Sequence, residues 1–216
     1  MTAAKSVPVT VGALDMHTRE LVELAIAIAT FREEAALRAA LSRTLAANVN
    51  PAWVEELILQ SYLFVGFPRA LNAAREWRRA SRRSPPPSDT DADPRNMPNW
   101  EARGEATCAT VYGDMYERLR RSIRELHPAL DAWMIVDGYG KVLSRPALDL
   151  WRRELCIVAV CGVDEQDRQL HAHLHGALNA GATPDAVDTV LDLVAPHVTN
   201  DARLRFRLLW ARVRKS

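Results

Sequence analysis

The sequence LDMHTRELVELA at residues 14–25 returns 134 positions later as LDLWRRELCIVA at residues 148–159. The two stretches share the frame Leu-Asp-x3-Arg-Glu-Leu. After one extra residue in the first half the offset becomes 133, and Leu41, Pro51 and Trp77 then match Leu174, Pro184 and Trp210. Matches that keep their order across a single gap predict a tandem duplication.

The periodicity in both halves is helical. In the first half Leu14, Leu21, Leu24 and Ile28 recur at the spacing of one helix face. Asn50-Pro51 and Thr183-Pro184 each combine a capping side chain with a proline in the first turn, which is typical of a helix start. No stretch alternates strictly between apolar and polar residues, as a half-buried strand would. We therefore predict an all-α fold.

Composition narrows the classes of function. Lys and Arg exceed Asp and Glu by 28 − 27 = +1 among 216 residues. A net charge this small does not produce the positive electrostatic potential that attracts nucleic acid or an anionic membrane. The longest apolar stretch, residues 155–163, is far shorter than the ~20 residues that span a bilayer, and no signal peptide is recognised at the start. Three cysteines do not make a disulfide framework. We expect a cytoplasmic protein.

A break in composition suggests the domain boundaries. Residues 80–99 contain five prolines and no aliphatic side chain larger than Met97, which favours a linker over a helix. We predict a first repeat over residues 1–79, a proline-rich linker over 80–103 and a second repeat over 104–216. The second repeat begins with an added helical arm, residues 104–147.

The motifs of the second half resemble the carboxymuconolactone decarboxylases and the related alkyl hydroperoxidase D-like proteins. Its matching segments are Tyr139-Gly140, Arg145-Pro146-Ala147-Leu148-Asp149, Arg153-Glu154-Leu155, His173 and Asn179-Ala180-Gly181-Ala182-Thr183-Pro184-Asp185. The first half adds a stretch similar to the family's Tyr-x-Gly-x-Pro-x-Ala-x-Asn segment, in which the matching positions include Tyr62, Pro68 and Asn72. The resemblance implies a helical hairpin core, assembly into trimers or hexamers, and substrate contacts at Tyr139, Tyr62, Pro68 and Asn72.

The departures from the family pattern decide the chemistry. The peroxidase branch uses Glu, Cys-x-x-Cys and His, and counting back from His173 places Gln169 and Gln166 at the cysteine positions. A redox dithiol needs two sulfurs close enough to bridge and a depressed thiolate pKa. Cys156 and Cys161 instead lie in an apolar helix, where we interpret them as buried hydrophobes. Peroxidase activity is therefore disfavoured.

His173 and Glu154 are the candidate catalytic pair. His173 lies at the edge of an apolar helical stripe and can exchange protons near neutral pH, and the resemblance gives it the acid/base role. The alternative is a core histidine bonded to a backbone carbonyl. Glu154 lies on an apolar helix, where burial raises a carboxyl pKa, and its alternative is an ion pair with Arg19 or Arg145. The first repeat has alanine, Ala40, at the position of the histidine.

Arg145 and Gln169 complete the candidate site. Arg145 precedes a proline at a helix entry and suits bidentate capture of a carboxylate, with pairing to Asp149 or Asp137 as the alternative. The Gln169 amide or the Tyr62 hydroxyl would stabilise an oxyanion. Because each repeat retains residues that the other lacks, we expect one composite pocket, and independent drift of two copies is the alternative.

No metal site is predicted. His171 and His175 stand one helical turn apart and could chelate a metal from one face. The usual adjacent Glu is missing and no third ligand is evident, so a solvated polar face is the preferred interpretation.

The resemblance implies a carboxy-lyase that decarboxylates a small carboxylated lactone or a similar intermediate of aromatic catabolism, or performs related proton-transfer chemistry, without a cofactor. We expect a small carboxylate substrate, no nucleic-acid or membrane partner, and a homo-oligomer, a trimer with a dimer as the alternative. The alternative function is that of a binding module, a helical oligomer without catalytic activity. The two are separated by whether His173 lines a cavity together with Glu154.

Overall fold

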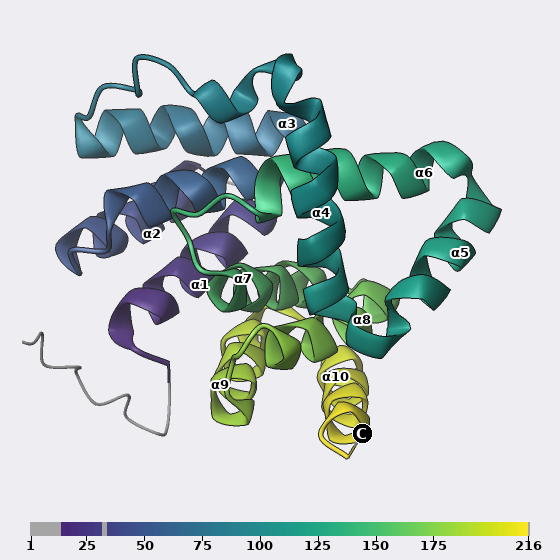
Figure 1. The fold of residues 1–216 in the computed structure, drawn as a ribbon. Coiled ribbons are helices and arrows are strands. Elements are labelled where there is room, and N and C mark those ends of the chain that lie inside the picture. Colours follow the sequence, from purple (N-terminus) through teal and green to yellow (C-terminus); the bar gives the residue numbers. More distant parts are fainter. Residues whose placement is uncertain (1–13, 32–33, 216) are drawn as a thin grey trace, which may run out of the picture.

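Helix α7 (Leu150–Val163) is the centre of an all-helical fold. In the computed structural model, which describes residues 14–31 and 34–215, every side chain from Arg153 to Gly162 is buried. Helices α1 (Met16–Ala29), α8 (Asp167–Asn179) and α9 (Pro184–Val194) pack around it (Figure 1). Among the described residues there is no strand, and no helix is both long and apolar enough to cross a membrane. The predicted all-α class is confirmed.

The two repeats have the same order of helices. Helices α1, α2 (Glu34–Ala46) and α3 (Pro51–Ser81) correspond to α7, α8 and the pair formed by α9 and α10 (Asn200–Val213). Helix α3 is interrupted at Gly66, whose φ of 78° favours glycine. Its counterpart Thr199 ends the connection between α9 and α10 and caps α10. The joint between α9 and α10 thus corresponds to the break in α3, which supports the duplication.

The capping residues at the repeated helix starts behave as the sequence indicates. The Asn50 side chain accepts a hydrogen bond from Ala52 N at the start of α3, and Thr183 Oγ1 accepts one from Ala186 N at the start of α9. Each of these side chains accepts a hydrogen bond from a backbone N–H group that has no partner within the first turn of its helix.

The segment between the repeats is more structured than predicted. After two short turns, η1 (Thr90–Ala92) and η2 (Pro94–Asn96), helix α4 (Met97–Tyr112) begins inside the predicted 80–103 linker. Pro98 is compatible with this helix because a proline in the first turn lacks only an N–H that has no helical partner. The Trp100 side chain is buried, and its Nε1 donates to the Asp91 carbonyl oxygen 2.9 Å away. The last residues of the predicted linker therefore belong to the folded core.

The added arm continues through α5 (Tyr116–Leu126), α6 (Pro128–Trp133) and a π-helix, η4 (Met134–Leu143). Helices α5 and α6 project from the side of the molecule (Figure 1). Helix α4 packs closely against η4, because Gly104 and Gly140 have no side chains to separate the two backbones. A Cβ at Gly104 would overlap the Ile135 carbonyl oxygen.

We predict that Gly104→Ala destabilises the protein by about 1–3 kcal/mol, the usual range for forced overpacking. Gly138→Ala in η4 is the matched control, because the nearest atom to its added Cβ lies 4.0 Å away. The control should leave the free energy of unfolding unchanged or raise it by up to about 1 kcal/mol. Urea unfolding of both variants measures the difference, and equal stabilities would contradict the close approach.

The α5–α6 hairpin supplies a pH-dependent contribution to stability. The buried Asp131 carboxylate accepts hydrogen bonds from Arg120 and Arg124, and Arg124 Nη2 lies 2.7 Å from Oδ2. The hydrogen bond from Arg120 lowers the pKa of Asp131 below its usual value near 3.8. The resulting stabilisation is fully present above that usual value and is lost as the pH falls towards the lower pKa of the folded protein.

We therefore predict that Asp131→Asn reduces stability by about 2 kcal/mol at pH 7, the scale of hydrogen bonds to a charged group. The difference between the variant and the parent should shrink as the pH is lowered below about 4. Asp114→Asn, at an exposed position in the described chain, is the control. Thermal unfolding between pH 2.5 and pH 7 provides the measurement, and a difference that is constant with pH would refute this assignment.

Candidate functional site

His173 and Glu154 form a buried dyad between α8 and α7. Nδ1 of His173 lies 2.8 Å from Oε2 of Glu154. Glu154 has no exposed surface, and His173 is 6% exposed. The histidine therefore bonds to a carboxylate and not to a backbone carbonyl, and Glu154 pairs with neither Arg19 nor Arg145.

The hydrogen bond decides which nitrogen of the histidine is available. We infer that Nδ1 of His173 donates to Glu154, because an ionised carboxylate only accepts hydrogen bonds. The other ring nitrogen, Nε2, has no hydrogen-bond partner among the described residues. This arrangement leaves Nε2 free to accept or to deliver a proton.

Gly176 makes room for the dyad. It lies less than one turn after His173 on α8, and a Cβ there would stand 2.6 Å from Glu154 Oε2 and 2.7 Å from Val111 Cγ1. Both distances are shorter than van der Waals contact, so only glycine lets α8 approach the buried carboxylate this closely.

His173 lines a pocket of about 810 Å³ that both repeats help to form. The first repeat contributes residues of α3, namely Tyr62, Leu63, Phe64 and Phe67. Helix α8 contributes Arg168, Gln169, Ala172 and His173. Mostly apolar side chains of α5, α6 and η4 form the remaining wall. The Phe64 ring meets the His173 ring edge to face at 6.0 Å between centroids. The pocket is thus composite.

Three phenols on the pocket wall stay protonated at neutral pH. Burial raises the pKa of Tyr112 to about 12 and holds the pKa of Tyr139 well above its usual 10. Burial, with the nearby charge of Asp137, also raises the pKa of Tyr62. These hydroxyls can therefore donate hydrogen bonds to a developing negative charge.

The structure brings together five of the predicted site residues and leaves three outside. His173, Gln169, Tyr139 and Tyr62 line the pocket, and Glu154 lies directly behind His173. Pro68 and Asn72 are not among the lining residues. Pro68 is exposed after the break in α3, and the Asn72 side chain accepts a hydrogen bond from Arg75. It is the adjacent Phe67 that reaches the pocket, where it stacks on Tyr62 at 4.7 Å.

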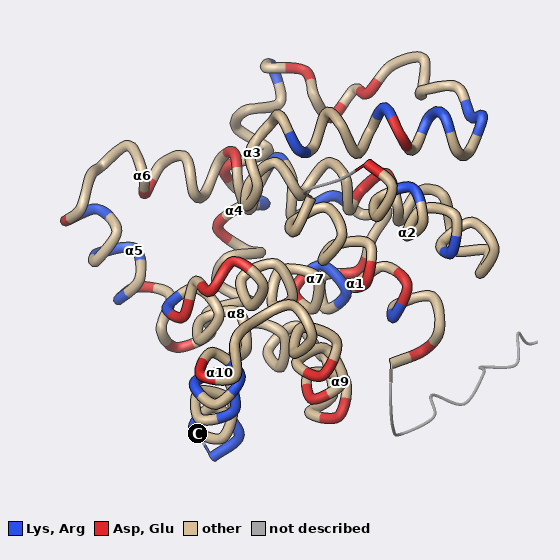
Figure 2. Tube along the Cα trace, turned by 180° about the vertical axis from the view of Figure 1, so that it is seen from behind, with Lys and Arg blue, Asp and Glu red and all other residues tan. Residues whose placement is uncertain are grey.

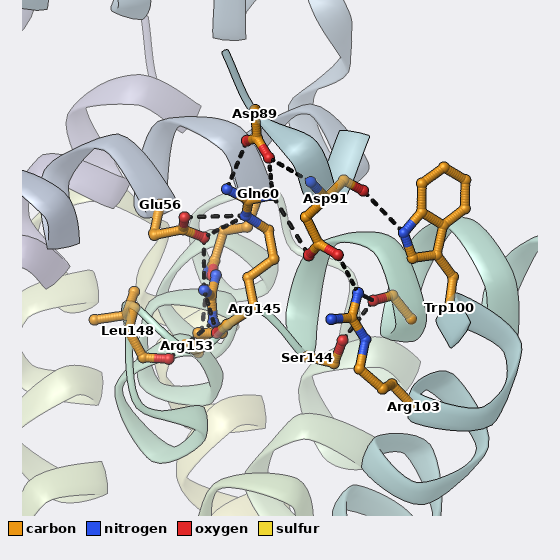
Figure 3. A network of polar contacts seen from close by, with 11 residues as sticks. Glu56, Gln60, Asp89, Asp91, Trp100, Arg103, Ser144, Arg145, Leu148 and Arg153 are labelled. Carbon is orange, nitrogen blue, oxygen red and sulfur yellow. Dashed lines mark hydrogen bonds and ion pairs between the residues drawn. The ribbon is translucent and has the colours of Figure 1, made fainter. Parts of the chain in front are cut away.

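Arg145 is the third residue outside the pocket, and its predicted availability for a substrate carboxylate needs correction. Its guanidinium contacts Glu56 at 3.0 Å and Asp89 at 2.8 Å (Figure 3). Neither partner is one of the two aspartates considered from the sequence. Both acids come from segments distant in sequence, so local spacing could not identify them.

The same network joins the two repeats. Arg153 of α7, which is fully buried, donates from Nη2 to Glu56 of α3 at 2.7 Å (Figure 3). Its Nη1 also donates to the Gln60 amide oxygen at 3.2 Å. Burial lowers the pKa of Arg153, and the Glu56 carboxylate opposes that effect. Arg145 and Arg153 are thus structural cations.

Sequence reasoning missed several polar residues of the pocket, namely Tyr112, Asp137, Lys141 and Arg168. Asp137 and Lys141 lie in the π-helix, whose spacing is not the helical period used to read the sequence. Arg168 directly precedes Gln169. The only signal for this turn of the helix was the spacing from His173 back to the cysteine positions of the family, which identified Gln169 but not Arg168.

The remaining candidates do not add a metal or thiol centre. No group of three or more His, Cys, Asp or Glu side chains in the described part of the chain is arranged to hold a metal ion. His171 and His175 are half-buried, and their ring centroids lie 5.0 Å apart. All three cysteines are buried, and burial raises the pKa of each thiol to about 12.

The fold and the site define a tandem-repeat helical protein with a buried carboxylate–histidine dyad at a composite pocket. The chain belongs to the carboxymuconolactone decarboxylase family, whose model matches residues 2–79 and 128–212. The two matched segments correspond to the two repeats, and the gap between them contains the linker, α4 and α5. The chain is also similar to Peroxisomal protein 2 of Schizosaccharomyces pombe, with 29% identity over 163 residues, 71% of this chain and 72% of that protein.

We predict that Gly176→Ala separates the dyad and lowers stability by about 1–3 kcal/mol, because the new methyl group occupies the space of the Glu154 carboxylate. Chemical-shift changes at the His173 ring and a shift of the unfolding midpoint are the two readouts. Gly138→Ala again serves as the control. An unchanged His173 ring in a folded Gly176→Ala variant would contradict the account.

Proposed function

We propose that this protein is a carboxy-lyase that removes carbon dioxide from a small carboxylated lactone, or performs closely related proton transfer, without a cofactor. The observation that supports the proposal is the 2.8 Å contact between Glu154 and a histidine on the pocket wall. A buried carboxylate beside Nδ1 orients the ring and leaves Nε2 for proton transfer to the substrate. The family membership supports the same choice of reaction.

The proposed step balances without an added redox agent. The bond between the lactone ring and its carboxylate breaks, carbon dioxide leaves, and the electron pair remains in the ring system as a dienolate. Nε2 of His173 takes up a proton from water and delivers it to carbon, after which the ring is neutral again with its remaining proton on Nδ1. The net reaction consumes one proton for each carbon dioxide released.

The other pocket residues have matching roles in this proposal. Protonated Tyr62 or Tyr139, or the Gln169 amide, would donate to the dienolate oxygen. Lys141 lines the pocket, and it replaces Arg145 as the candidate partner for the substrate carboxylate. The apolar walls exclude water, which strengthens these charge interactions.

The geometry favours catalysis over the non-catalytic module. A module was expected to bury its histidine against the backbone, whereas His173 contacts a carboxylate and lines a cavity. The raised thiol pKa values disfavour a peroxidase, because the thiolate is the reactive form.

The proposed enzyme works as a homo-oligomer, a trimer or alternatively a dimer. Phe67 and Trp133 are 62% and 61% exposed on the single chain, and association of copies would cover them. We propose a cytoplasmic location. The name of the Schizosaccharomyces pombe relative makes the peroxisome the alternative.

We predict that His173→Gln lowers the rate of decarboxylation about a hundredfold to ten-thousandfold, since it keeps hydrogen bonding but removes proton transfer. Glu154→Gln should also lower the rate, through loss of the charge-assisted hydrogen bond that orients the His173 ring. His197→Gln, at an exposed histidine outside the pocket, should keep the parental rate. The assay follows loss of absorbance of 4-carboxymuconolactone.

Parental turnover by a folded His173→Gln protein would refute the assignment of the proton carrier. An equal loss in His197→Gln would show that the effect is not specific to the site.

A further inference from the structure

A second hollow, of about 830 Å³, lies between α5 and α8 beside the pocket that contains His173. Arg118, Leu119 and Ser122 line it from α5, at the spacing of one helix face. Positions 168, 171, 172, 175 and 179 line it from α8, again on a single face. Two helix faces thus meet across a cavity that the proposed reaction does not use.

The cations of this second pocket have no protein partners. Within the described residues, neither the Arg118 nor the Arg168 guanidinium makes a hydrogen bond or an ion pair, and no Asp or Glu lines the hollow. On the same helix, Arg120 and Arg124 both bind Asp131. The two arginines that face the hollow are exposed, and no carboxylate of the described residues neutralises their charge, which gives a positive potential there.

The acidic residues nearby in sequence do not pair with these two arginines. Asp114 and Glu117, next to Arg118, are exposed and form no ion pair with it. Asp167 precedes Arg168, and its carboxylate binds Arg205 of α10 at 2.9 Å. Figure 2 shows the basic residues of α5 and α10 on either side of α8. Since no carboxylate in the described part of the chain binds Arg118 or Arg168, an anion from solution can pair with them.

Two half-buried histidines add donors to the same wall. The His171 and His175 rings stand 5.0 Å apart, edge to face. Burial, together with the charge of His171, lowers the pKa of His175. A bound anion would oppose this lowering of the His175 pKa, because a nearby negative charge favours the charged imidazole.

We propose that the second pocket binds the carboxylate or phosphate group of a small organic anion. Arg118 and Arg168 hold the oxyanion, since a guanidinium presents paired donors that match both groups. Met115, Leu119 and Ala172 form an apolar wall for the organic part. Four residues, among them Arg168 and Tyr112, line both pockets, so the anion lies next to the site at His173. The binding itself does not depend on the proposed decarboxylation.

Nuclear magnetic resonance of the full chain tests the proposal. Benzoate, phenyl phosphate and benzyl alcohol are titrated at constant ionic strength, and the ring signals of His171, His175 and His173 are followed. We expect saturable shifts of His171 and His175 with benzoate, phenyl phosphate or both, and none with benzyl alcohol at the same concentrations. The two anions distinguish a carboxylate from a phosphate ligand.

Arg118→Gln should weaken anion binding at least tenfold, as expected for loss of a charge-assisted hydrogen bond. Arg121→Gln is the matched control, because Arg121 is an exposed arginine of the same helix that does not line the hollow. It should change the dissociation constant less than twofold, and thermal unfolding verifies that both variants are folded.

Three results would overturn the proposal. Benzyl alcohol that binds as well as the anions would show an apolar pocket without charge recognition. An equal effect of Arg121→Gln would show non-specific attraction. Shifts confined to His173 would place the anion in the first pocket, an outcome that leaves the proposed decarboxylation intact.

Discussion

Two adjacent charged residues, Arg153 and Glu154, are fully buried in the central helix, and the rest of the structure depends on how they are paired. A buried charge without a partner is strongly destabilising, so each must find an opposite or proton-bearing group. Successive side chains of a helix point in different directions. Arg153 therefore reaches Glu56 of the first repeat, whereas Glu154 reaches His173 of α8. One dipeptide joins the repeats and also builds the candidate site.

The first repeat shows what happens to the same frame without these partners. Its counterparts are Arg19, which is 49% exposed and pairs with Glu23, and Glu20, which lies 3.7 Å from Arg43. The histidine position is Ala40, which is buried. This repeat has no dyad, yet it supplies Glu56 to the inter-repeat network and Tyr62 to the pocket wall. The duplication has produced copies with different tasks.

Local patterns in the sequence were sufficient for the helices and the repeat, and the family resemblance identified the residues of the dyad. The repeated frame around Arg153-Glu154 and the spacing of nineteen residues from Glu154 to His173 can be read directly from the sequence. The helix caps at Asn50 and Thr183 depend on neighbours only a few residues away. The start of α4 was missed because prolines were taken as breakers, although the first helical turn accepts them.

Long-range pairings could not be predicted in this way. The partners of Arg145 are Glu56 and Asp89, which precede it by 89 and 56 residues, and no periodicity links these positions. The pocket wall also depends on where the arm of α5, α6 and η4 folds back. The path of this arm is set by close backbone contacts such as the one between Gly104 and Ile135. A glycine in the sequence does not reveal which distant segment packs against it.

The most direct test of the central claim is the tautomer of His173, measured by nitrogen-15 nuclear magnetic resonance of the protein labelled at histidine. The account predicts a neutral ring protonated at Nδ1, with Nε2 unprotonated, and a loss of that preference in Glu154→Gln. A ring protonated at Nε2 in the parent, unchanged by Glu154→Gln, would contradict it.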